Sequence, residues 1–89
     1  MGSGQRQNPM AKIVFPDHLL PTTHGTRELE LSAANFRELL ESLESRWPGS
    51  QDVLEKCAVA IDGQIYQDAY LEELQSTSEV FFMQRIEGG

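Results

Sequence analysis

The chain has 89 residues, 39% of them hydrophobic, which predicts one small globular domain with a thin core. Fourteen acidic residues against seven Lys and Arg give a net charge of −7, and the lack of a basic cluster excludes a typical nucleic-acid binder. The acidity favours partners with positive surfaces, or serves solubility alone. There is no apolar run of the roughly 18 residues that a membrane span needs, no signal peptide and only one cysteine, so we expect a cytoplasmic protein.

The chain divides into three parts by composition. Residues 1–10 (MGSGQRQNPM) are polar and aperiodic, and we expect an expression-derived or disordered leader there. Residues 11–87 carry the apolar periodicity and are predicted to form the domain. Residues 88–89, Gly-Gly, are predicted to be a flexible tail, because glycine has the largest conformational freedom and no side chain to pack.

The first structured region is predicted to be a hairpin. Residues 11–15 (AKIVF) form a short apolar run, and residues 27–31 (RELEL) alternate with period two, as strands do. Between them, residues 16–25 hold two prolines and a glycine and are predicted to be a wide loop.

A helix is predicted next, because five apolar residues lie on one helical stripe: Phe36, Leu39, Leu40, Leu43 and Trp47. Asn35 can cap it together with Glu38, with Ser32 as the competing start, and Pro48-Gly49 ends it. The acidic side chains of Glu38, Glu41 and Glu44 are predicted to face solvent.

The second half is predicted to contain three strands. Residues 56–61 and 64–66 flank Asp62-Gly63, a strong two-residue hairpin turn. Residues 68–78 are a polar connection with a possible helical turn at 70–74, and residues 79–86 form the last strand. Two strands, one helix and three strands predict an α+β fold of the β-grasp plan, with one mixed sheet covered by one main helix.

No active site is evident within the domain. His18 and His24 lie six residues apart in a loop without further ligands, so no metal site or bound cofactor is expected. Cys57 lies among apolar strand residues on the face assigned to the core and is predicted to be a buried packing residue.

The last strand carries the candidate partner-binding residues. Period two places Val80, Phe82 and Ile86 on the core side, and Phe81 and Met83 on the other side beside Arg85. Exposed apolar groups on a charged protein mark a partner surface, unless another segment covers them. The candidate partner-binding residues are Phe81, Met83, Arg85 and Ile86.

Taken together, these features resemble the ubiquitin-like sulfur carriers of the MoaD/ThiS family, which includes the molybdopterin synthase small subunit and thiamine- or cysteine-pathway carriers. The resemblance covers residues 12–89 and rests on the helix "FRELLESLESRWPG", the hairpin "VAIDGQIY", the strand "EVFFMQ" and Gly88-Gly89. Two features depart from the family pattern: Ser76-Thr77-Ser78 replaces an Asp-Gly-Asp turn, and Gln84-Arg85 replaces two prolines.

The resemblance implies a function for the tail. Gly89 would be adenylated by an ATP-dependent activating enzyme and converted to a thiocarboxylate, with Gly88 as its channel-fitting neighbour. A sulfur-accepting biosynthetic enzyme would be the second partner. The chain would then be a carrier and no enzyme itself, with ATP used by its partner and no nucleic acid or membrane involved.

Two alternatives share the same fold. The chain could be a ubiquitin-like modifier joined through Gly89 to lysines of target proteins, or an interaction module whose tail never reacts. The iron–sulfur version of the β-grasp fold is excluded, since a cluster needs four cysteines. The sulfur-requiring pathway is left open by the sequence.

Overall fold

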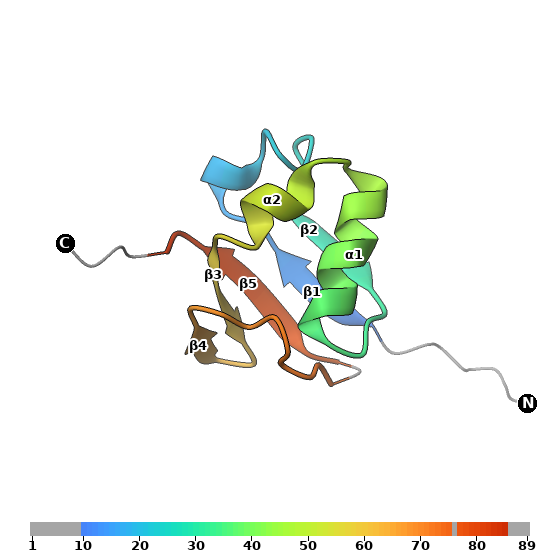
Figure 1. Ribbon diagram of the computed structural model, residues 1–89, viewed down its shortest axis with the longest axis vertical. Helices are drawn as coiled ribbons and strands as arrows, with labels where there is room; N and C mark the ends of the chain where they lie inside the picture. Colours follow the sequence, from blue (N-terminus) through green and yellow to red (C-terminus); the bar gives the residue numbers. More distant parts are fainter. Residues whose placement is uncertain (1–9, 76, 86–89) are drawn as a thin grey trace, which may run out of the picture.

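The computed structural model describes residues 10–75 and 77–85. Their elements follow the order β1 (Ala11–Val14), the 3-10 helix η2 (Asp17–Leu19), β2 (Glu28–Leu31), α1 (Phe36–Arg46), α2 (Ser50–Leu54), β3 (Ala58–Ile61), β4 (Gln64–Tyr66) and β5 (Glu79–Met83) (Figure 1).

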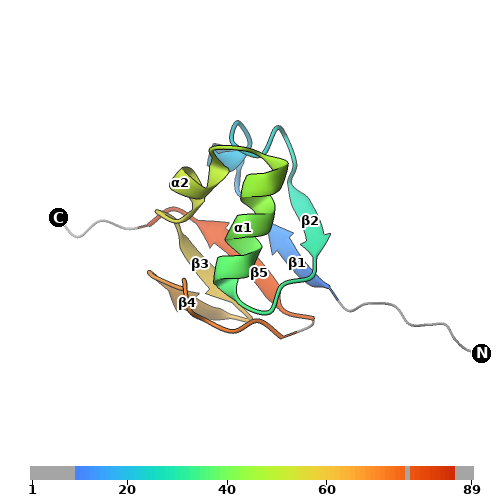
Figure 2. The same ribbon diagram turned by 45° about the vertical axis from the view of Figure 1, so that its right-hand side comes forward.

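The five strands form one mixed sheet in the order β2-β1-β5-β3-β4. The strands β1 and β5 are parallel, and the other neighbouring pairs are antiparallel. Figure 2 shows α1 lying across one face of this sheet. The predicted fold class, an α+β β-grasp with one main helix on a mixed sheet, is confirmed.

The opening hairpin is also confirmed, with Ala11 opposite Leu31 and Val14 opposite Glu28. The loop after β1 is more ordered than predicted, because residues 17–19 form the 3-10 turn η2 and bury the side chain of Leu19. Burial of Leu19 explains the turn, because this apolar side chain gains free energy when it leaves water for the core.

The start of α1 is fixed by Asn35, as predicted. The Asn35 side chain accepts a hydrogen bond from the Glu38 backbone N–H (2.9 Å), and Glu38 Oε1 accepts one from the Ala34 N–H (3.0 Å). The reciprocal bond thus reaches one residue further back than in a capping box. The predicted apolar stripe is confirmed, since its five members are all buried: Phe36, Leu39, Leu40, Leu43 and Trp47.

A second helix, α2, was not predicted, and its formation depends on Glu44. The Glu44 carboxylate accepts hydrogen bonds from the backbone N–H groups of Gly49 (2.8 Å) and Gln51 (2.9 Å). These bonds hold the pKa of Glu44 below its ordinary value. Gly49 enables the turn through its left-handed backbone, with φ at +93°. The prediction that Glu44 only faces solvent was therefore incomplete.

The hairpin of β3 and β4 turns at Asp62-Gly63, as predicted. Both residues have positive φ, +50° and +87°, as a type I′ turn requires. Asp62 also ties this turn to the start of β5: Oδ1 accepts from the Glu79 N–H (2.9 Å) and Oδ2 from the Ser78 hydroxyl (2.7 Å). These bonds lower the pKa of Asp62. The Asp62 carboxylate therefore holds Ser78, the residue before β5, in place.

The connection between β4 and β5 does not contain the predicted helical turn. It forms a non-helical turn at Tyr70 and Leu71, followed by an isolated bridge between Asn35 and Glu73. The bridge and the burial of Ala69 and Leu74 hold the segment against the core. Tertiary contacts outweigh the weak local preference for a helical turn.

Candidate functional site

Two adjacent phenylalanines on β5 face opposite sides of the sheet. Phe82 is 3% exposed and packs between the rings of Phe15 and Phe36, with centroids 5.5 and 5.7 Å away. Phe81 is 41% exposed. The predicted register of the strand is confirmed, since Val80 and Phe82 are buried and Phe81 is exposed.

Phe81 belongs to a row of apolar residues that crosses four strands. Register pairs it with Val14 on β1 and with Ala60 on β3, and Ala60 is paired with Ile65 on β4. Paired residues point to the same face of a sheet, so these side chains share the face opposite α1. Ile65 is 61% exposed. We call this group, together with half-buried Met83, the open-face patch: Val14, Ala60, Ile65, Phe81 and Met83.

A charged border adjoins the open-face patch on the side of β2. Glu28 is the register partner of Val14, and its carboxylate lies 3.8 Å from Lys12 Nζ. Lys12 in turn is paired with Glu30 and Glu79. An apolar centre with a charged rim is the usual composition of a protein–protein interface. The arrangement can therefore bind a protein surface.

Arg85 was expected beside Phe81 and Met83, and the structure places its side chain elsewhere. One guanidinium N–H donates to the Gln67 carbonyl (2.6 Å), and Nε is buried without a partner in the part of the chain that the structure describes. The strand ends at Met83, so its alternation does not extend to Arg85. The side chain turns to the helix side, where it lines a pocket.

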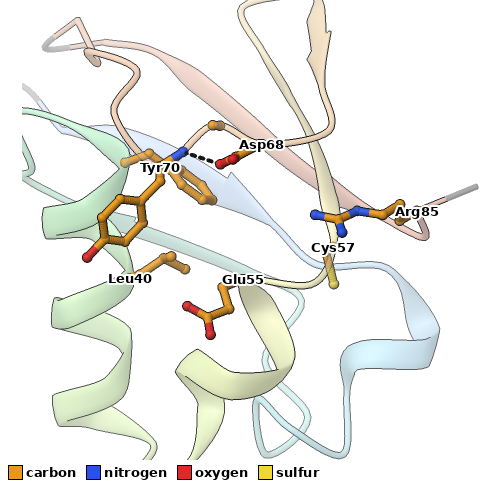
Figure 3. Close-up of a pocket in the computed structure, with 8 residues that line it drawn as sticks. Leu40, Glu55, Cys57, Asp68, Tyr70 and Arg85 are labelled. Atoms are coloured by element: carbon orange, nitrogen blue, oxygen red, sulfur yellow. Dashed lines mark hydrogen bonds between the residues drawn. The ribbon is translucent and has the colours of Figure 1, made fainter.

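That pocket has a volume of about 370 Å³ and lies at the edge of the helix layer (Figure 3). Its lining residues come from α1, the segment after α2, the connection after β4 and the segment after β5: Phe36, Leu40, Glu55, Cys57, Asp68, Ala69, Tyr70 and Arg85. Cys57, predicted to be buried, is only half-buried, since it precedes β3. Burial raises the pKa of its thiol, and the charge of Arg85 acts in the opposite direction. A thiol with a raised pKa is a poor nucleophile.

The two histidines lie apart from both surfaces. His18 is in η2, and His24 is exposed and stacks on Trp47 with ring centroids 6.3 Å apart. Within residues 10–75 and 77–85, no three side chains of the metal-binding types come together. Gly88, Gly89 and Ile86, the other predicted site residues, lie outside the described residues.

Sequence reasoning missed the contributions of Ile65, Ala60 and Val14 to the open-face patch. A signal existed: Ile65 alternates with Gln64 and Tyr66 in a short hairpin strand, so its face follows from the register of the turn. The pocket had no such signal, since its residues come from four separate segments of the sequence.

Comparison with known proteins identifies the fold. No protein-family model matches the sequence, and no curated protein matches it. Solved structures do match. A chain of the Amycolatopsis orientalis BexX/CysO complex superposes with a TM-score of 0.74 at 19% identity, over 89% of this chain and 99% of that one.

Two further matches come from archaea. The small archaeal modifier protein 1 from Methanosarcina acetivorans has a TM-score of 0.68 at 22% identity, over 90% of this chain and 96% of that one. The putative molybdopterin converting factor subunit 1 from Pyrococcus furiosus has a TM-score of 0.67 at 19% identity, over 86% and 98%. At these identities the likeness establishes a shared ubiquitin-like β-grasp fold.

Among the described residues, no helix is long and apolar enough to span a membrane.

Proposed function

We propose that this protein is a ubiquitin-like sulfur carrier with Gly89 as its reactive carboxyl terminus. The observation that supports it most is the combination of this fold with the sequence Gly88-Gly89, which begins five residues after the end of β5, the central strand. The likeness to a putative molybdopterin converting factor subunit supports the same reading.

The chemistry follows from the weakness of a carboxylate as an electrophile. A partner enzyme joins the Gly89 carboxylate to the α-phosphate of ATP, releasing pyrophosphate, and the acyl-adenylate then has AMP as a leaving group. A sulfur donor displaces AMP and leaves a thiocarboxylate on Gly89. Gly88 and Gly89 suit this role, because residues without side chains pass through a narrow channel and expose the carbonyl carbon.

The open-face patch supplies the docking surface in this proposal. Phe81 and Ile65 are large exposed apolar groups on a protein of net charge −7, and such groups mark partner surfaces. A match to a chain of a two-protein complex, BexX/CysO, supports the expectation that the fold works with a partner. The partners we propose are the ATP-dependent activating enzyme and a sulfur-accepting biosynthetic enzyme.

The test is a mass measurement. With its activating enzyme, ATP and a sulfur donor, the protein is expected to gain the mass of one sulfur-for-oxygen exchange, located on Gly89. A variant without Gly89 is the matched control and should keep the same unfolding transition. Modification of the truncated variant would contradict the proposed role of Gly89, as would an intact protein that its true partner never modifies.

A second function, conjugation to proteins, is favoured by the likeness to a small archaeal modifier protein. Both functions use the same activation step, so activation alone does not separate them. Conjugation predicts higher-mass adducts in cell extract in which the carboxyl group of Gly89 is joined to lysine side chains. A carrier without conjugation gives thiocarboxylate and no adducts.

A further inference from the structure

The pocket on the helix side is a second exposed surface, separate from the open-face patch. Its floor is apolar: Phe36 and Leu40 of α1 are 3% and 0% exposed, and Ala69 is 4% exposed. Tyr70, which is 39% exposed, lines the pocket beside Leu40 (Figure 3). Part of the surface of Tyr70 is thus available to a side chain that enters the pocket.

The rim of the pocket is mainly acidic. Glu55 and Asp68 both line it, and neither takes part in an ion pair within residues 10–75 and 77–85. Arg85, the one cation among the lining residues, donates to the Gln67 carbonyl instead. The Asp68 carboxylate accepts a hydrogen bond from the Tyr70 N–H (3.3 Å), but both carboxylates lack a cation among the residues described. Covering such carboxylates with an apolar surface is unfavourable unless a cation comes with it. The rim therefore selects an occupant with a positive group.

The position of Arg85 connects the pocket to the tail. Arg85 is four residues before Gly89, and an extended residue spans at most about 3.6 Å, so Gly89 lies within about 14 Å of Arg85. An enzyme that holds Gly89 in its active site therefore comes within about 14 Å of Arg85, one of the residues that line the pocket. The pocket is lined by residues of α1, which covers one face of the sheet, whereas the open-face patch lies on the other face. Arg85 of the pocket and Phe81 of the patch both belong to the segment that leads to Gly89.

We propose that this pocket receives an apolar side chain of the enzyme that activates Gly89, with a neighbouring Lys or Arg that pairs with Glu55 and Asp68. The inference rests on the proposed function, since it assigns the partner through Gly89. A second copy of this chain fits less well, because two proteins of net charge −7 repel each other. Small anions are disfavoured by the same carboxylates.

The test compares charge reversals at two exposed positions. Glu55→Lys is expected to weaken binding to the activating enzyme at least about tenfold, because a like charge would face the partner's cation. The matched control is Glu41→Lys, the same change on the outward side of α1, which should alter the dissociation constant less than about threefold. Tyr70→Ala should weaken binding without changing charge, through loss of the ring as an anchor.

Glu55→Gln keeps the shape of the side chain and removes only its charge. The dissociation constant of this variant should depend less steeply on salt than that of the wild type, since one ion pair is missing. The enzyme should also shift the NMR signals of Ala69 and Tyr70. Circular dichroism and thermal unfolding check that each variant is folded.

The outcomes separate the two proposals. If the wild type gains sulfur, but Glu55→Lys and Glu41→Lys bind equally well and Ala69 and Tyr70 do not shift, the pocket proposal is overturned and the carrier function stands. If saturating enzyme restores sulfur transfer to Glu55→Lys, the pocket acts in docking, as proposed. A wild type that never gains sulfur overturns both. A small polyamine is the comparison ligand. If Glu55→Lys weakens binding of the polyamine as much as binding of the enzyme, the pocket binds cations in general, and the proposal that an enzyme side chain occupies it is overturned.

Discussion

The two faces of the sheet each carry a phenylalanine of β5, and the two side chains differ in their exposure to water. On the covered face, Phe82 packs against Phe15 and Phe36 and has lost nearly all its contact with water. On the open face, the neighbouring Phe81 keeps 41% of its surface exposed. The difference is one of position rather than chemistry. It shows that the covered face carries stability, whereas the open face is free to carry recognition.

The largest expected effect is on the covered face. Phe82→Asp places a charge among aromatic rings and should unfold the domain. The free-energy cost of burying an unpaired charge exceeds the unfolding free energy of a small domain. Phe81→Asp should leave the unfolding transition nearly unchanged. Circular dichroism during thermal unfolding of both variants checks this. Unfolding of Phe81→Asp with a folded Phe82→Asp would mean that the faces are reversed.

The helix side of the covered face predicts the next largest effect. Leu40 is 0% exposed, so Leu40→Ala should cost about 2–5 kcal/mol of unfolding free energy, through lost burial and a cavity. Glu41→Ala, on the outward side of α1, should change it by less than about 0.5 kcal/mol. Urea unfolding measures both. Equal costs would contradict the packing of α1 described here.

On the open face, we expect substitutions to weaken binding to a partner and to leave stability nearly unchanged. Phe81→Asp should weaken binding to the activating enzyme or the acceptor enzyme at least about 30-fold, since a buried aromatic anchor contributes about 2 kcal/mol or more. Ile65→Asp, in the same row, should act in the same direction. Isothermal titration calorimetry measures the loss. If both variants bind as tightly as the wild type, the open-face patch is not the docking surface.

The smallest expected effect is on the bonds that fix the register of β5, and this register decides which side chains lie on each face of the sheet. Asp62 holds the start of this strand through Ser78 and Glu79, and it is exposed, so Asp62→Asn should cost about 1 kcal/mol or less. Because the folded pKa of Asp62 is lowered, its contribution is present at pH values above the unfolded pKa and is lost as pH falls through the folded pKa. Wild-type stability should therefore fall more steeply than that of Asp62→Asn in acid. Parallel slopes would mean that the carboxylate contributes nothing.

Much of the covered face could be predicted from the sequence, because its signals are periodic. The stripe from Phe36 to Trp47 has the helical period, and Val80 and Phe82 follow the period of a strand. Asp62-Gly63 specifies a turn by itself, since few residue pairs accept two positive φ angles. These local rules determined the order of elements and hence the fold.

The parts that could not be predicted depend on contacts between distant residues. The helix α2 needs the carboxylate of Glu44 to satisfy its first N–H groups, and five residues are too few to show a helical period. The Arg85 side chain does not lie on the expected face, because its guanidinium donates a hydrogen bond to the Gln67 carbonyl. The pocket likewise exists only once separate segments have been brought together.

The parallel pairing of β1 with β5 has a consequence for how the domain forms. The two local hairpins, β1 with β2 and β3 with β4, can each close early, because their partners are near in sequence. They become one sheet only when β5 enters between them, which joins Lys12 to Glu79 across 67 residues. The last strand in the sequence is thus the one that completes the core, so folding is expected to be governed by the slow closure of this long loop. Any chain interrupted before β5 would have two unjoined halves and nothing to present to a partner.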